Sequence, residues 1–239
     1  MIVFPLDVPS IDAAAPLIDS LSGHVGMFKV GLELYIKAGP QIIQMIHDKS
    51  SADIFLDLKL HDIPTTVERA MRVIAGLGVQ FTTVHCGESH SMMEAAVAGS
   101  QGRTKVLGVT VLTSVDAADI RAAGFQEPYA EDVKRLVIKR AAMAGKAGCA
   151  GVICSGHEAG PVKAELGDSF LAITPGIRPS WEVSGRDDQA RVMTPERAVQ
   201  NGSDYLVIGR PIRDAADPVS AAERIAEEIE IGLAARAGE

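Results

Sequence analysis

The chain has 239 residues, of which 47% are hydrophobic and 23% are charged, and its formal net charge is -8 at pH 7. This length suits one large domain, and the composition supports a packed core and argues against disorder. An acidic chain without a long basic run also argues against a surface that binds nucleic acid.

Cysteine usage and the N-terminus indicate where the protein resides. The three cysteines, Cys86, Cys149 and Cys154, are too few and too irregularly spaced to predict a disulfide framework or a zinc site. The opening segment MIVFPLDVPS has no basic region typical of a signal peptide, and no apolar run approaches the length of a membrane span. We therefore expect a cytoplasmic protein that makes no contact with membranes.

Short apolar runs rich in Val, Ile, Leu and Phe recur along the chain, as is typical of buried parallel strands. They lie at residues 2–7, 27–31, 54–59, 81–85, 106–112, 151–155, 171–175 and 205–209. Amphipathic spacing predicts helices between them, at 64–77 and 130–147 for example. A further helix should begin at Pro195, with Thr194 as its cap, and end before Gly202, whereas residues 234–239 should fray.

Eight strand-then-helix units favour an α/β fold of the (β/α)8 TIM-barrel type, formed as a single domain by residues 1–239. A doubly wound parallel sheet is the alternative, but that fold rarely needs eight such regular units. In a TIM barrel the active site lies at the C-terminal ends of the strands.

The third predicted strand places charge at that end of the barrel. Its leucines and isoleucine alternate with Phe55, Asp57 and Lys59, so an apolar face toward the helices turns these three side chains inward. Asp7, Lys29 and Thr113 lie in or near the ends of other predicted strands, and Asp62 follows the third strand itself. Buried charges without partners are costly, so these residues form either a structural ion-pair network or a catalytic array. We favour the catalytic array, because perturbed charges cluster at functional sites.

A phosphate site is predicted after the eighth strand. Gly209 lets backbone N–H groups approach an anion, and Arg210 can bind it in a bidentate manner. The preceding segment, residues 176–191, contains Arg178 and Gln189 among glycines and few apolar residues, which predicts a mobile loop over the site. The alternative interpretation is an ordinary exposed loop and a glycine that starts a helix.

Residues 55–66, FLDLKLHDIPTT, resemble the D-x-K-x-x-D-I-P-x-T signature of the orotidine 5′-phosphate decarboxylase family, in its bacterial form. The resemblance covers nearly the whole chain and includes the segments at residues 6–7, 28–31, 83–85, 111–114, 174–179 and 207–212. It implies decarboxylation of orotidine 5′-phosphate to UMP, the last step of de novo UMP biosynthesis, with no cofactor and no metal.

The resemblance also implies a role for each matching residue. Lys59 would protonate the ring carbon that loses carbon dioxide, and Asp57 would face the substrate carboxylate. Lys29 and Asp62 would complete the charged array. Further contacts to substrate would come from Asp7 and Lys29 (ribose), Thr113 (pyrimidine), Thr66 (the partner's nucleotide) and Arg178, Gln189, Gly209 and Arg210 (phosphate and its loop). The implied assembly is a homodimer with shared active sites, in which Asp62 reaches into the site of the partner subunit.

Two rival functions remain open at this point. Magnesium-dependent sugar-phosphate barrels, such as 3-keto-L-gulonate 6-phosphate decarboxylase and hexulose-phosphate synthase, share the D-x-K-x-x-D core. They carry a metal-binding acid where this chain has Lys29, and they lack the Ile63-Pro64 continuation. A non-catalytic phosphate-binding barrel is the other rival, but it would need a broken charged array.

Overall fold

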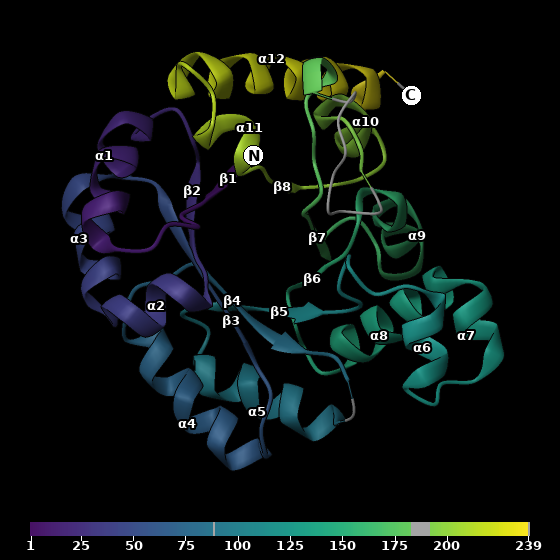
Figure 1. The fold of residues 1–239 in the computed structure, drawn as a ribbon. Coiled ribbons are helices and arrows are strands. Elements are labelled where there is room, and N and C mark those ends of the chain that lie inside the picture. Colours follow the sequence, from purple (N-terminus) through teal and green to yellow (C-terminus); the bar gives the residue numbers. More distant parts are fainter. Residues whose placement is uncertain (88, 183–191, 239) are drawn as a thin grey trace.

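The computed structural model describes residues 1–87, 89–182 and 192–238. In this part of the chain, eight parallel strands pair in sequence order and β1 pairs with β8, so the sheet closes into a (β/α)8 barrel surrounded by helices (Figure 1). The strands are β1 (Ile2–Pro5), β2 (Met27–Val30), β3 (Asp53–Leu60), β4 (Phe81–His85), β5 (Lys105–Val109), β6 (Gly151–Ile153), β7 (Leu171–Thr174) and β8 (Tyr205–Val207). The predicted fold class is confirmed.

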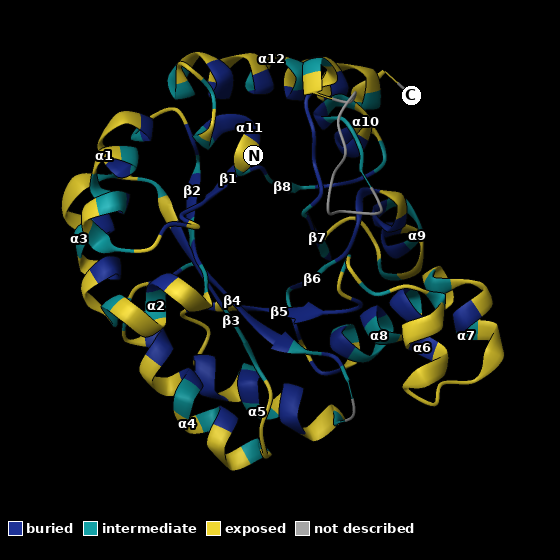
Figure 2. Cartoon of the chain, viewed as in Figure 1, coloured by how far each residue is buried: buried dark blue, intermediate teal, exposed yellow. Residues whose placement is uncertain are grey.

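The helices that cover the barrel present a buried face to the strands and an exposed face to solvent (Figure 2). They are α1 (Ile11–Leu21), α2 (Leu32–Ala38), α3 (Gln41–Lys49), α4 (Pro64–Ala75), α5 (His90–Ser100), α6 (Ala117–Ala122), α7 (Glu127–Glu131), α8 (Val133–Lys146), α9 (Gly156–Leu166), α10 (Pro195–Gln200), α11 (Arg210–Arg213) and α12 (Pro218–Ala237), with a 3-10 turn, η1, at Ser180–Glu182. No helix in the described ranges is long and apolar enough to cross a bilayer.

Three boundary predictions can be compared with the structure. The cap at Thr194 is confirmed, because its side chain accepts a hydrogen bond from the backbone N–H of Arg197. The predicted helix at 130–147 is wrong at its start, because α8 begins at Val133 and Asp132 caps it by accepting from the N–H of Lys134.

The expected fraying of residues 234–239 is wrong as far as Ala237, where α12 ends, and Glu239 lies outside the described residues. The helix packs on α10, and Gly232 permits that close approach. A Cβ added at Gly232 would lie only 2.6 Å from the carbonyl oxygen of Glu196. Ala234, Ala235 and Ala237 are themselves exposed, so they extend a helix that is anchored just before them, at Gly232.

Two hydrophobic layers lie on opposite faces of the strands. The larger layer lies between the strands and the helices and includes Ile54 and Leu56 of β3. The smaller layer fills the barrel interior with side chains from six strands: Val3, Met27, Phe55, Phe81, Leu107 and Ile173. The rings of Phe55 and Phe81 pack edge to face at 6.1 Å. The interior is thus closed below the mouth, and polar chemistry is confined to the C-terminal ends of the strands.

Candidate active site

A continuous chain of opposite charges lies across the mouth of the barrel. Nζ of Lys59 is 2.8 Å from Oδ2 of Asp57, and Nζ of Lys29 is 3.7 Å from the same oxygen. Lys29 also donates to Oδ1 of Asp7, at 3.3 Å. Three neighbouring strands supply these groups. Asp7 follows β1, Lys29 lies in β2, and Asp57 and Lys59 lie in β3. The sequence therefore predicts correctly that these four residues meet.

Of these four charged residues, Asp57 is the least exposed, with 11% of its side chain accessible to solvent. Burial alone would raise the pKa of its carboxyl group. The charges of Lys29 and Lys59, together with hydrogen bonds from Lys59 and Thr83, outweigh burial and lower the pKa below the ordinary value. Asp57 is consequently a fixed negative charge at neutral pH, held between two cations.

Lys59 reaches this position through an unusual backbone conformation. Its φ angle is +51°, in the left-handed region, and the pairing of β3 with β4 changes register between Leu56 and Leu60. Such an irregularity re-aims a side chain at the end of a strand. The side chain of Lys59 therefore shares the barrel mouth with Asp57.

A mainly apolar pocket of about 220 Å³ opens beside this charged group. Its charged wall is Lys29, Asp57 and Lys59, and the remaining lining comes from Phe55, Val109, Val111, Leu112, Thr113, Ile153, Cys154, Pro175 and Val207. Thr113 thus lies where the sequence places it, at the rim of the pocket after β5. The shape and lining suit a flat, mostly apolar ring with a few polar edges.

A second, more polar pocket of about 290 Å³ adjoins the first, and Pro175 and Val207 line both. It is lined by Pro5, Asp7, Pro175, Gly176, Arg178, Val207, Gly209, Arg210 and Arg213. Gly209 packs against the ring of Pro5, and an added Cβ would lie 2.9 Å from that ring. Three arginines and a helix-start glycine give this end of the mouth a lining suited to an anion.

The segment that carries Arg178 is anchored at two points. The backbone N–H of Arg178 donates to the carbonyl oxygen of Met193, at 3.0 Å. Two residues on, the N–H and the hydroxyl of Ser180 both donate to Oε1 of Glu228 on α12, at 3.0 and 2.9 Å. Arg178 itself is buried, so its guanidinium is held in a defined place at the polar pocket.

Two predicted site residues lie apart from both pockets. Asp62 and Thr66 are exposed on the loop after β3 and on α4, and Asp62 accepts a hydrogen bond from the N–H of Ile63 at 2.7 Å. Gln189 and most of the predicted mobile loop lie outside the described residues. The described structure therefore brings together Asp7, Lys29, Asp57, Lys59, Thr113, Arg178, Gly209 and Arg210, and leaves Asp62 and Thr66 on the surface.

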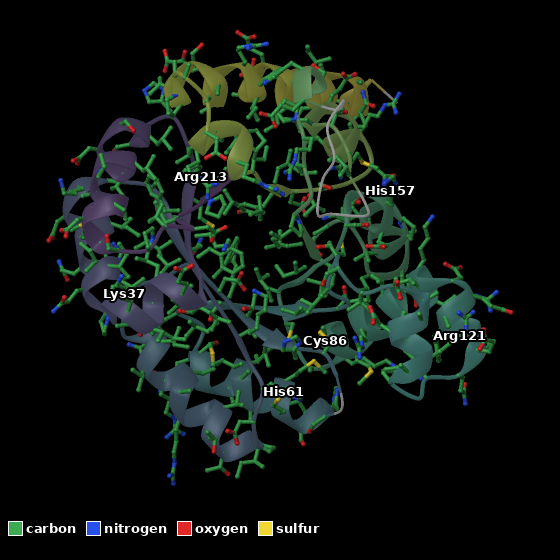
Figure 3. The ribbon with its side chains drawn as sticks, viewed as in Figure 1. Lys37, His61, Cys86, Arg121, His157 and Arg213 are labelled. Carbon is green, nitrogen blue, oxygen red and sulfur yellow. The ribbon has the colours of Figure 1, made fainter. Side chains whose placement is uncertain are left out.

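Sequence reasoning missed two residues at the mouth. Arg213 on α11 lines the polar pocket and donates to the backbone carbonyl of Asp7, at 3.1 Å, and Figure 3 shows it beside β1. The sequence signal that could have identified Arg213 is its position one helical turn after Arg210. Thr83 of β4 contacts both Asp57 and the backbone of Lys59. Its inward place follows from strand alternation two residues after Phe81.

The combined geometry can hold a phosphorylated ring compound and act on the end of the ring that faces the lysines. Two ammonium groups can stabilise negative charge that develops on a bound molecule, and either can donate a proton. No cluster of three or more His, Cys, Asp or Glu side chains suited to a metal ion occurs within residues 1–87, 89–182 and 192–238.

Comparison with known proteins identifies relatives along nearly the whole chain. The sequence model of the family described as "Orotidine 5'-phosphate decarboxylase / HUMPS family" matches residues 1–225. The chain is 52% identical to the orotidine 5′-phosphate decarboxylase of Desulfosudis oleivorans, over 97% of this chain and 94% of that protein. It is 45% identical to the enzyme of the same name from Saccharophagus degradans, over 95% and 94%. Among solved structures, the orotidine 5′-phosphate decarboxylase of Lactobacillus acidophilus superposes with a TM-score of 0.83 at 35% identity, over 95% of this chain and 98% of that one.

Proposed function

The chain belongs to the orotidine 5′-phosphate decarboxylase / HUMPS family, and we propose that its site converts orotidine 5′-phosphate to UMP and carbon dioxide. Among the activities of this family, orotidine 5′-phosphate decarboxylation is supported best by one observation. A charged array lies beside an arginine-lined pocket, and it consists of Asp7, Lys29, Asp57 and Lys59. A lysine at position 29 disfavours the magnesium-dependent members of the family, because it puts a cation where they carry a metal-binding acid.

The two adjoining pockets support one orientation of the substrate. The phosphate binds at Gly209 and Arg210, with Arg178 beside them, and the ribose lies near Asp7 and Lys29. The pyrimidine enters the mainly apolar pocket, where Thr113 hydrogen-bonds its polar edge. This orientation brings the ring carbon that bears the carboxylate to Asp57 and Lys59. We retain Gln189 as a phosphate contact on the basis of the family resemblance alone.

The chemistry follows from the fixed charges. The bond between the ring and the carboxylate breaks, carbon dioxide leaves, and the electron pair stays on the ring carbon. The ammonium of Lys59 stabilises that negative charge and then supplies the proton that gives UMP. Asp57 repels the substrate carboxylate, an effect that is lost when carbon dioxide departs. Water returns a proton to Lys59, so turnover needs no cofactor.

We propose that the active unit is a homodimer. Asp62 and Thr66 belong to the motif that carries the resemblance, yet they lie on the surface beside Ile63, a residue that is 66% exposed. An exposed apolar residue flanked by motif residues suits a contact between two copies of the chain. In the dimer, Asp62 and Thr66 of one subunit complete the site of the other.

The remaining parts of the proposal concern the chain as a whole. Residues 1–239 form one catalytic domain, since all eight strands contribute to one barrel. The enzyme works in the cytoplasm, where thiols stay reduced, and the free cysteines Cys86, Cys149 and Cys154 support this. Neither nucleic acid nor a membrane is part of the proposed activity.

The deciding experiment is an assay of UMP formation from orotidine 5′-phosphate, with and without exhaustive EDTA treatment. We expect full activity in both cases, and we expect Lys59→Ala to abolish turnover while the barrel stays folded. A parallel assay uses 3-keto-L-gulonate 6-phosphate with Mg²⁺. Turnover of that sugar phosphate, or activity with orotidine 5′-phosphate that EDTA removes and Mg²⁺ restores, would contradict the proposal.

A further inference from the structure

The hydroxyl group of Thr83 lies between the two central residues of the charged array. We propose that Thr83 is the positioning residue of the site, which fixes the carboxylate of Asp57 and the backbone of Lys59 relative to each other. This inference rests on the proposed function, and it adds β4 to β1, β2 and β3, the strands that supply the charged array.

The hydrogen bonds of Thr83 have a defined direction. A threonine hydroxyl has one donor and two acceptor positions. Oγ1 of Thr83 donates to Oδ1 of Asp57, at 2.9 Å, and accepts from the backbone N–H of Lys59, at 2.8 Å. Because Oδ1 of Asp57 is bound in this way, Oδ2 is the oxygen that contacts Nζ of Lys59 and faces Lys29. Thr83 thus sets the rotation of the carboxylate toward the two cations.

The contact with the backbone of Lys59 also stabilises an unfavourable backbone conformation. A left-handed φ of +51° is disfavoured for a residue that has a Cβ, so it persists only where the surroundings hold it. The register of β3 with β4 is irregular at this point, between Leu56 and Leu60. The hydroxyl of Thr83 takes the N–H of Lys59 there, and thereby stabilises the conformation that points the lysine into the mouth.

The neighbouring threonine supplies a matched comparison. Thr82 and Thr83 are both fully buried, but they point to opposite faces of β4. The hydroxyl of Thr82 has no hydrogen-bond partner in the described part of the chain, whereas that of Thr83 has two. Thr82→Val therefore tests what the loss of a buried hydroxyl from this strand does by itself.

The experiment compares wild type, Thr83→Val, Thr83→Ser and Thr82→Val in steady-state assays with orotidine 5′-phosphate. We expect Thr83→Val to lower kcat by about 10- to 100-fold with a much smaller change in KM, since the ground-state contacts to ribose and phosphate remain. Thr83→Ser keeps the hydroxyl and should stay within about threefold of wild type, as should Thr82→Val. If Thr83→Val does not fold, Thr83→Ala replaces it in the comparison with Thr83→Ser.

The pH profile separates positioning from general loss of structure. The charged groups that act on Asp57 are Lys29 on β2 and Lys59 on β3, whereas His85, the ionisable residue of β4, lies beside the ring of His61. Thr83→Val removes a hydrogen bond that favours ionised Asp57, so the acidic limb of the kcat profile should move to higher pH. In Thr82→Val it should not move. The pKa of the Asp57 carboxyl group, followed by carbon-13 NMR without substrate, should rise in Thr83→Val.

Results that would refute the role of Thr83 differ from those that would refute the proposed function. A folded Thr83→Val enzyme with wild-type kcat and an unmoved pH profile overturns the inference, as does a Thr83→Ser enzyme that is as impaired as Thr83→Val. If wild type itself does not decarboxylate orotidine 5′-phosphate, the proposed function fails. The substrate-free NMR titration of Asp57 then still decides whether Thr83 positions the carboxylate: an unchanged pKa in Thr83→Val refutes that role.

Discussion

Nζ of Lys29 lies 3.7 Å from Oδ2 of Asp57 and so joins β2 to β3 across the mouth of the barrel. The positive charge of Lys29, together with that of Lys59, lowers the pKa of Asp57. The two residues therefore behave as one electrostatic unit, and a change at either affects the other.

Replacement of Lys29 by alanine should consequently raise the pKa of Asp57 and impair catalysis. We expect kcat/KM to fall by roughly 100-fold or more, because a preorganised charge and a ribose contact are both lost. Lys37→Ala is the matched control, since Lys37 is exposed on α2, and Figure 3 shows it away from the barrel interior. Steady-state kinetics and a carbon-13 NMR titration of Asp57 provide the measurement. A Lys29→Ala enzyme with the kinetics of the control would remove Lys29 from the array.

Acid should selectively weaken the contribution of Asp57 to folding stability. Its pKa in the folded state is below the ordinary value of 3.8, so its stabilising effect is complete above that value and is lost as the pH falls through the lower, folded-state pKa. Asp57→Asn should therefore melt at a lower temperature than wild type at pH 7, and the difference should shrink below about pH 4. Asp168→Asn, at an exposed site, serves as the control. A difference that stays constant or grows in acid would show that Asp57 is not held as a stabilised anion.

Arg210→Ala should lose catalysis as well as binding, because the energy of the phosphate contact is partly realised in the transition state. We expect kcat/KM for orotidine 5′-phosphate to fall by at least about 100-fold. Orotidine, which lacks the phosphate, should be a poor substrate for wild type and nearly insensitive to this change. Arg121→Ala is the control, since Figure 3 shows Arg121 on α6 at the outer edge of the molecule. Equal losses with both substrates would mean that Arg210 does not contact the phosphate.

Mixed dimers test whether Asp62 acts across a subunit interface. Lys59→Ala and Asp62→Ala homodimers should each be severely impaired. When the two variants are unfolded and refolded together, each mixed dimer contains one site that lacks both groups and one site that has both. With random pairing, half of the dimers are mixed, so the activity should reach about a quarter of wild type. The separately refolded variants are the controls. If mixed dimers form and activity stays at the level of those controls, Asp62 serves its own subunit.

The inward face of β3 could be predicted because its alternation is regular and its outer residues are all apolar. Phe55 and Asp57 follow that alternation in the structure, and the predicted contact between Asp57 and Lys59 is present. The predicted strands at 106–112 and 205–209 extend past the real ends of β5 and β8, because apolar residues that line the mouth look like strand in sequence. Small errors in the predicted strand ends therefore leave the order of the motifs around the barrel unchanged.

Other features depend on contacts that local sequence does not encode. Lysine has no preference for a left-handed backbone, so the conformation of Lys59 follows from the irregular pairing with β4 and from Thr83. Arg213 reaches the polar pocket only because β8 closes next to β1, which brings α11 to Asp7. The exposed position of Asp62 also follows from no local signal, and the mixed dimers test its role.

The closure of β8 onto β1 has a consequence for how the protein is made. The ribosome releases β1 to β3 first, so Lys29, Asp57 and Lys59 are present early in the growing chain, but Gly209 and Arg210 emerge near its end. Pairing between segments so distant in sequence is slow compared with local structure. An incomplete chain can therefore carry the reacting lysines without any means of holding the phosphate of a nucleotide. The phosphate pocket, which needs Asp7 and Arg210 together, can therefore be completed only after β8 and the start of α11 have been synthesised.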